Sequence, residues 1–207
     1  MMTPYGPGSP EKSPDPNDLI FACSPHEGGS TDFISEWIAE IWKNAGYSAR
    51  IVFLRDYNIQ FCRGCGKCSL TGRCVLEDVD DCRLLFEMLR TSRMLCFCVP
   101  IYFYHIPAQF KAWIDRSQSV YSDKSGYWIA DSGIKPQVKT VFAAGRKRGN
   151  ALFAGSELTL KYFLSSFGRE SRALGLLGIE DRQDLFMGRE NILRRLQRHV
   201  FQNIDIT

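Results

Sequence analysis

Four cysteines of the 207-residue chain lie close together in the sequence, at Cys62, Cys65, Cys68 and Cys74. Their spacing, Cys-x2-Cys-x2-Cys-x5-Cys, places three thiols on one short stretch of backbone and a fourth a few residues beyond. Structural zinc sites usually use two Cys-x2-Cys pairs well separated in sequence, whereas iron-sulfur clusters favour compact runs. The spacing therefore favours an iron-sulfur cluster and leaves open a zinc ion, or thiols and disulfides without a metal.

The remaining cysteines fall on predicted strands and a predicted helix, at Cys23, Cys82, Cys96 and Cys98. We expect them to be small buried side chains, as free cysteines often are. The chain starts without a basic region followed by an apolar stretch, which is the pattern of a secretory signal. We therefore expect a reducing cytoplasmic location, in which clustered cysteines bind metals or do redox chemistry.

Alternating strand and helix patterns predict the elements that position these cysteines. The strands are expected at residues 19–23, 49–54, 94–99, 138–144 and 172–179, and the helices at 30–45, 80–91, 107–120, 157–167 and 190–201. This alternation is typical of a parallel sheet with helices on both faces. The longest apolar run, residues 94–104, is about half of the ~20 residues that cross a bilayer, so no membrane span is expected.

The sequence predicts one folded domain, residues 18–207, with a cysteine-rich loop at 57–79. Residues 1–17 contain five of the nine prolines and are predicted to be a flexible tail, because they offer little apolar surface to bury. Ligands of open parallel sheets bind beyond the carboxyl ends of the strands. The loops after the strands are therefore the places to look for a ligand.

The loop after the first strand is suited to a phosphate. It is rich in glycine and hydroxyl groups and leads directly into a helix N-terminus, where backbone amides attract anions. The alternative is an ordinary helix start capped by Ser or Thr. The loop contains neither G-x-G-x-x-G nor Gly-Lys-Ser/Thr, which argues against a dinucleotide fingerprint and a P-loop. The candidate phosphate-binding residues are Ser24, His26, Gly29, Ser30 and Thr31.

Aromatic residues follow the third strand, and small residues follow the fourth. The aromatic loop is suited to packing against a flat ring system, although it could instead simply cover the edge of the core. The residues in question are Pro100, Ile101, Tyr102, Phe103, Tyr104 and His105 after the third strand, and Ala144 and Gly145 after the fourth.

These motifs together resemble those of a known family. The Ser24-Pro25 loop ending in Gly29-Ser30-Thr31, the cysteine motif, and Pro100-Ile101-Tyr102 followed by the string IPAQFKAWIDR at 106–116 are similar to iron-sulfur flavoproteins. Those proteins belong to the wider NADPH-dependent FMN reductases, which have a flavodoxin-like fold. The chain departs from the family pattern at Cys23, where glycine is usual, and at His26, where arginine is common.

The resemblance implies a three-layer sandwich whose five parallel strands have the order 2-1-3-4-5. It also implies that FMN rests its phosphate on the first loop and its ring against the aromatic loop and the Ala144–Gly145 loop. The four clustered cysteines would hold a [4Fe-4S] cluster. No catalytic side chain is expected, because the flavin carries the chemistry.

The implied function is that of an FMN-dependent oxidoreductase or electron-transfer flavoprotein, with electrons passing between FMN and the cluster and on to a partner. NAD(P)H is the expected donor, a redox protein or small molecule the acceptor, and a homodimer or homotetramer the expected assembly. One alternative is a cluster-free NAD(P)H-dependent reductase of FMN or quinones. A remote alternative is a metal-stabilised nucleic-acid-binding module that uses Arg194, Arg195 and Arg198; the leading prediction includes no nucleic acid.

Overall fold

A computed structural model describes residues 18–129 and 137–202, so the predicted tail at 1–17 lies outside the described residues. Five strands form one sheet in the order β2-β1-β3-β4-β5, and every neighbouring pair is parallel. This confirms the predicted strand order. The strands are β1 (Asp18–Ala22), β2 (Ala49–Phe53), β3 (Met94–Pro100), β4 (Gln137–Ala144) and β5 (Ser171–Leu177).

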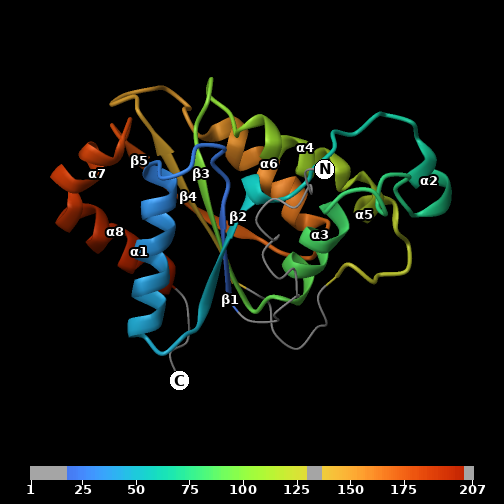
Figure 1. The fold of residues 1–207 in the computed structure, drawn as a ribbon, viewed down its shortest axis with the longest axis horizontal. Coiled ribbons are helices and arrows are strands. Elements are labelled where there is room, and N and C mark those ends of the chain that lie inside the picture. The colour runs from blue at the N-terminus through green and yellow to red at the C-terminus, as the bar shows by residue number, and fades with distance from the viewer. Residues whose placement is uncertain (1–17, 130–136, 203–207) are drawn as a thin grey trace, which may run out of the picture.

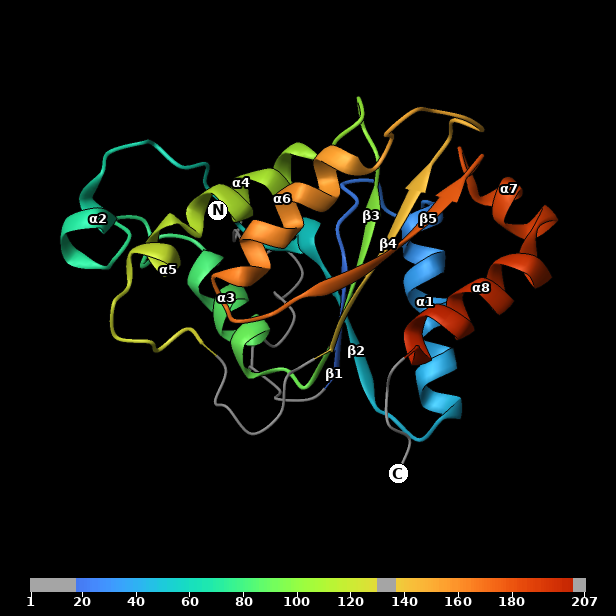
Figure 2. The ribbon, with the colours of Figure 1, turned by 180° about the vertical axis from the view of Figure 1, so that it is seen from behind.

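Helices cover both faces of the sheet, as Figures 1 and 2 show from opposite sides. One face carries α1 (Ser30–Asn44), α7 (Arg182–Met187) and α8 (Arg189–Phe201). The other carries α3 (Cys82–Thr91), α4 (Ala108–Arg116), α5 (Gln118–Ser122) and α6 (Ala154–Ser165). The short helix α2 (Lys67–Thr71) projects from the edge of the molecule beside α5, away from the sheet. None of the described helices has the length and apolar character needed to cross a bilayer.

The central strands are buried on both faces, which explains why β1 and β3 are apolar along their whole length. Side chains alternate between two cores, one under α3, α4 and α6 and one under α1 and α8. In the first core, the rings of Phe21, Phe97 and Phe110 stack in series, with centroids 5.2 and 5.6 Å apart. This packing fixes α4 against the middle of the sheet.

The structure corrects one predicted element and adds two. The single helix expected over residues 107–120 is divided into α4 and α5 at Ser117. The Ser117 hydroxyl donates to the Ile114 carbonyl at 2.7 Å, a local bond that competes with continued helix. The helices α2 and α7 were not expected, because each spans only five or six residues and shows little periodicity.

Candidate functional site

The loop between β1 and α1 lies at the carboxyl end of the sheet and lines a cavity of about 540 Å³. Gly28 in this loop has a φ of 67°, a conformation that favours glycine and reverses the chain before the helix. The Ser24 hydroxyl accepts a hydrogen bond from the His26 backbone amide at 3.1 Å, which closes the first turn. All five predicted phosphate-binding residues line this cavity: Ser24, His26, Gly29, Ser30 and Thr31.

Ser30, the first residue of α1, provides a test of whether a phosphate fits. Its Oγ is buried and has no hydrogen-bond partner among the described residues. A buried polar atom left without a partner costs on the order of 1–3 kcal/mol. Gly29, the residue before α1, has no side chain to cap the helix, and the first amides of a helix lack carbonyl partners within the preceding turn. The donors present therefore fit an anionic group.

Asp32 places a carboxylate in the same helical turn, and Arg55 neutralises it. The two side chains form a pair of hydrogen bonds of 3.0 and 2.9 Å. Asp32 also accepts from the Gly28 backbone amide at 2.8 Å. Because Asp32 is buried and already paired, it fixes the loop against the end of β2 without adding a net negative charge to the cavity.

The aromatic loop after β3 forms a second wall. The first cavity is lined by Pro100, Ile101, Tyr102 and Gly145, and an adjoining cavity of about 320 Å³ is lined by Phe103, Tyr104 and Ala144. Phe103 and Tyr104 have φ angles of 48° and 65°, which are strained for residues other than glycine. This turn leaves the Phe103 side chain entirely exposed beside the cavity.

His105 lines neither cavity. Its Nε2 lies 3.2 Å from the Thr159 hydroxyl on α6, and its backbone pairs with Tyr102 through bonds of 2.8 and 2.9 Å. The imidazole therefore anchors the aromatic loop to α6. Every other residue predicted to bind FMN lies on one of the two cavities. That these residues bind a cofactor stays a prediction.

The segment after β5 forms a third wall of the cavity, which was not predicted from the sequence. This segment includes Glu180, Asp181 and Gln183, and it leads into α7 through a capping box made by Asp181 and Asp184. A Cβ added at Gly145 would lie 1.6 Å from Glu180 Oε2, so glycine leaves room for that carboxylate. The position of this segment, which follows the fifth strand and so lies at the same sheet edge as the other loops, could have predicted this wall.

The four clustered cysteines line a separate cavity of about 330 Å³. Gly66 and Gly72 have φ angles of 70° and 72° and bound the short helix α2 at both ends. Cys62 and Cys65 are exposed, Cys68 and Cys74 are half-buried, and all four thiols are free. In the described part of the chain, no three His, Cys, Asp or Glu side chains are grouped so as to hold a metal ion.

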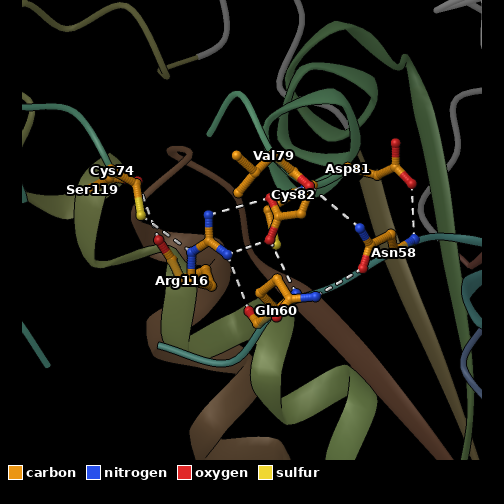
Figure 3. Close-up of polar contacts among 9 residues, drawn as sticks. Asn58, Gln60, Cys74, Val79, Asp81, Cys82, Arg116 and Ser119 are labelled. Carbon is orange, nitrogen blue, oxygen red and sulfur yellow. Dashed lines mark hydrogen bonds and ion pairs between the residues drawn. The ribbon is translucent and has the colours of Figure 1, made fainter. Parts of the chain in front are cut away.

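Arg116 and Asp80 join the start and the end of the cysteine loop, and Figure 3 shows the labelled Arg116 between Gln60 and Cys74. The Arg116 guanidinium donates to the Asp80 carboxylate, to the Gln60 carbonyl at 3.0 Å and, through Nε, to Cys74 Sγ at 3.2 Å. Cys82 lies in the same cluster, and burial raises its pKa to about 12. Cys82 is therefore a neutral thiol.

The other cysteines outside the loop are also buried, which confirms the expectation that they pack in the core. Burial raises the pKa of Cys23 well above its ordinary value. A hydrogen bond with Cys98, together with burial, does the same for Cys96. Cys96 and Cys98 lie in β3 and Cys23 directly follows β1, and none of the three lines the cavity that the clustered cysteines share.

The basic helix α8 was the basis of the nucleic-acid alternative. Two of its arginines bond to the protein itself: Arg194 Nε donates to the Glu190 carbonyl at 3.3 Å, and Arg195 Nη2 donates to the Gly175 carbonyl at 2.7 Å. These bonds favour the simpler interpretation of α8 as a helix that covers the sheet.

Comparison with known sequences matches residues 17–144, more than half of the chain, to the family model described as NADPH-dependent FMN reductase. An iron-sulfur flavoprotein of Archaeoglobus fulgidus is 31% identical over 129 residues, which cover 62% of this chain and 60% of that protein. An iron-sulfur flavoprotein of Methanosarcina thermophila is 31% identical over 94 residues, covering 45% of this chain and 48% of that protein. The matches thus span only about half of the length of these relatives.

Comparison with solved structures supports the fold. An NAD(P)H:quinone oxidoreductase from Methanothermobacter marburgensis superposes with a TM-score of 0.63 at 19% identity, covering 87% of this chain and 91% of that one. An FMN-dependent NADH-azoreductase from Bacillus anthracis gives a TM-score of 0.60 at 12% identity, covering 87% and 98%. At such low identities the likeness establishes a shared flavodoxin-like architecture.

Proposed function

The chain belongs to the NADPH-dependent FMN reductase family, and from this premise we propose that it is an FMN-dependent oxidoreductase whose cysteine loop holds a [4Fe-4S] cluster. When bound, FMN would supply two-electron chemistry and the cluster one-electron chemistry. The protein's own contribution is to hold the two groups, to exclude water from the flavin ring and to provide an exit for electrons.

The unpartnered Ser30 hydroxyl is the observation that carries the FMN assignment. It lies in the cavity at the uncapped start of α1, where a phosphate would receive its hydrogen bond and those of the backbone amides. The aromatic loop and the Gly145 loop form the neighbouring walls, which suit a flat ring. The Asp32–Arg55 pair would keep the loop in this conformation without repelling the phosphate.

The shared cavity of Cys62, Cys65, Cys68 and Cys74 supports the cluster. A four-iron cluster takes one thiolate per iron, so its ligands must line a space rather than meet at one ion. The loop carries Arg63, which is exposed and can offset the negative charge of such a cluster. The names of the archaeal relatives point to the same pairing of cofactors.

NAD(P)H is the proposed electron donor, and a redox protein or small molecule the proposed acceptor. We also propose a homo-oligomer, because apolar side chains are exposed around the cysteine loop, including Phe61 at 69%, Leu70 at 87% and Tyr121 at 75%. The exposed free thiols support the reducing cytoplasm as the location.

Cofactor analysis of anaerobically purified protein tests this function. We expect about one FMN, four iron and four acid-labile sulfide per chain, with flavin absorption on top of a broad cluster spectrum. Protein that contains FMN but almost no iron would contradict the cluster. That outcome would favour the second candidate, a cluster-free NAD(P)H-dependent reductase of FMN or quinones, to which the shared fold with the quinone oxidoreductase lends support.

A further inference from the structure

Arg116 is the last residue of α4, and only 2% of its surface is exposed. Its guanidinium connects α4 with three residues that lie 36 to 56 positions away in the sequence: Gln60 at the start of the cysteine loop, Cys74 within it and Asp80 directly after it. Figure 3 shows the guanidinium between Gln60 and Cys74. The C-terminal end of α4 thus contacts the cysteine loop through the buried Arg116 side chain.

The positive charge of Arg116 is balanced by the negative charge of Asp80, without any contribution from Cys74. The Asp80 carboxylate is fully buried and accepts from both terminal nitrogens of Arg116. It also accepts from the Gln60 amide at 3.0 Å and from the Cys82 amide at 3.2 Å. Because these four donors satisfy the carboxylate, the buried ion pair is well compensated. The Nε proton of Arg116 is left to donate to the Cys74 sulfur.

Cys74 differs from the other three clustered cysteines in this respect. Among the described residues it is the one member of the set whose sulfur receives a side-chain hydrogen bond. It is also the cysteine set apart by the longer spacing, five residues after Cys68. The closely spaced Cys62, Cys65 and Cys68 are held near one another by the short backbone between them. The hydrogen bond from Arg116 fixes the position of Cys74, which this short segment does not include.

The planar shape of arginine explains why this residue type is needed. The two terminal nitrogens bind one carboxylate in a fork, while the Nε–H points in the same plane toward a different partner. A lysine at the same position would keep the charge but has one nitrogen, which cannot serve Asp80 and Cys74 in the same way. The Arg116→Lys substitution therefore distinguishes the effect of the positive charge from the effect of the directed hydrogen bonds.

The other end of α4 lies at the aromatic loop. Gln109, in the first turn, donates from Nε2 to the Leu54 carbonyl at 3.0 Å and to the Tyr57 carbonyl at 3.3 Å. The helix begins right after the aromatic loop and ends at Arg116, a distance along its axis of about 12 Å. It is a short rigid connection between the candidate flavin ring site and the cysteine loop.

From this geometry we propose that Arg116 is a positioning residue that holds Cys74 as the fourth cluster ligand and raises the reduction potential of the cluster through its N–H···S hydrogen bond. The inference rests on the proposed function, since it assumes that the cysteine loop holds a cluster. A hydrogen bond to a ligand sulfur stabilises the more negative, reduced form of a cluster, and so it raises the potential.

The test compares Arg116→Lys with the matched variant Arg63→Gln, measured by redox titration of the anaerobic holoprotein with detection by electron paramagnetic resonance. Arg63→Gln removes a positive charge from the exposed part of the loop and leaves the Arg116 bond intact. Arg116→Lys keeps the charge and loses the bond. We expect Arg116→Lys to shift the midpoint potential of the cluster to more negative values by more than Arg63→Gln does, because solvent screens the exposed charge.

Each outcome bears on the inference. A cluster midpoint potential in Arg116→Lys equal to that of the wild type, at full iron and sulfide content, would overturn the inference. Loss of iron from a variant that keeps its circular dichroism spectrum and FMN content would support the positioning role. If Arg116→Lys does not fold, the double substitution Arg116→Met with Asp80→Asn leaves no unpaired charge buried and is judged by the same criteria. Wild-type protein without iron would instead contradict the proposed function, which separates the two failures.

Discussion

The phosphate loop, residues 24–31, and the cysteine loop, residues 57–79, are built in opposite ways. The phosphate loop is short, leads into a long helix and is fixed by the buried Asp32–Arg55 pair. The cysteine loop projects from the body of the molecule and has mostly exposed side chains between Cys62 and Thr71. The polar cluster of Arg116 and Asp80 is its main attachment and lies where the loop begins and ends.

This difference indicates how the two cofactors relate to folding. The sheet and α1 form the candidate phosphate site whether or not a ligand is present, because the strands that carry it are buried over almost their whole length. The cysteine loop has few apolar contacts of its own, so much of its order would come from the proposed metal cluster. FMN binding and cluster binding should therefore fail independently when each site is altered.

Cys65→Ser gives the largest expected effect. Removing a ligand from the exposed part of the loop should abolish nearly all cluster iron, while FMN content stays at the wild-type value because the phosphate loop is untouched. Iron, sulfide and FMN assays on anaerobic protein measure both. The matched control is Cys96→Ala, a cysteine buried in β3, which should keep its iron. Parallel loss of FMN in Cys65→Ser would show that the sites are not independent.

Low pH should destabilise the whole fold and thereby weaken both candidate sites at once. His199 on α8 is buried, and its Nε2 lies 3.2 Å from the Thr140 carbonyl on β4. Burial, together with the nearby cations Lys139 and Arg172, lowers the pKa of His199 to about 4. In the unfolded chain a histidine titrates near 6.5, so between these pH values the unfolded state binds more protons and becomes favoured.

Protonation linked to His199 therefore lowers the free energy of unfolding by at most about 3 kcal/mol as the pH falls from about 6.5 to about 4, because solvent screens part of the effect. Urea unfolding across this range, compared between wild type and His199→Gln, isolates this contribution from that of the carboxylates. The variant should lose less stability on acidification. Identical pH dependence in the two proteins would refute the assignment to His199.

Ser30→Ala gives the smallest of the three effects and the most local. It removes the hydroxyl expected to donate to the FMN phosphate, and a hydrogen bond to a charged group contributes about 1.5–3 kcal/mol. The Kd for FMN should rise at least tenfold, while the stability of the FMN-free protein stays equal or increases. Ser156→Ala is the control, because its buried Oγ also has no partner among the described residues but lies on α6, outside the cavity proposed for FMN. Equal FMN affinities for the two variants would contradict the phosphate assignment.

The sequence predicted those features that local pattern determines. The apolar runs predicted all five strands, and the position of the loops after them predicted two walls of the candidate FMN cavity. The burial of Cys82, Cys96 and Cys98 followed from their places on a helix and a strand.

Local sequence patterns could not predict the contacts between segments that are distant in the sequence. The orientation of His105 toward Thr159 depends on a turn with two positive φ angles, which no local preference of Phe103 or Tyr104 predicts. Glu180 reaches the cavity only because β5 lies next to β4 in the sheet. The contacts of Arg116 with Asp80 and Cys74 join residues 36 and 42 positions apart and become visible only in the folded chain.

A reductive titration under anaerobic conditions tests the central claim, that one fold holds a flavin and a cluster as separate redox groups. Wild type and Cys65→Ser are reduced stepwise, and the electrons taken up per FMN are counted together with the absorption changes. The account predicts that the wild type accepts one electron more per FMN than the variant does, since a [4Fe-4S] cluster accepts a single electron. Equal electron uptake by the two proteins, at equal FMN content, would contradict it.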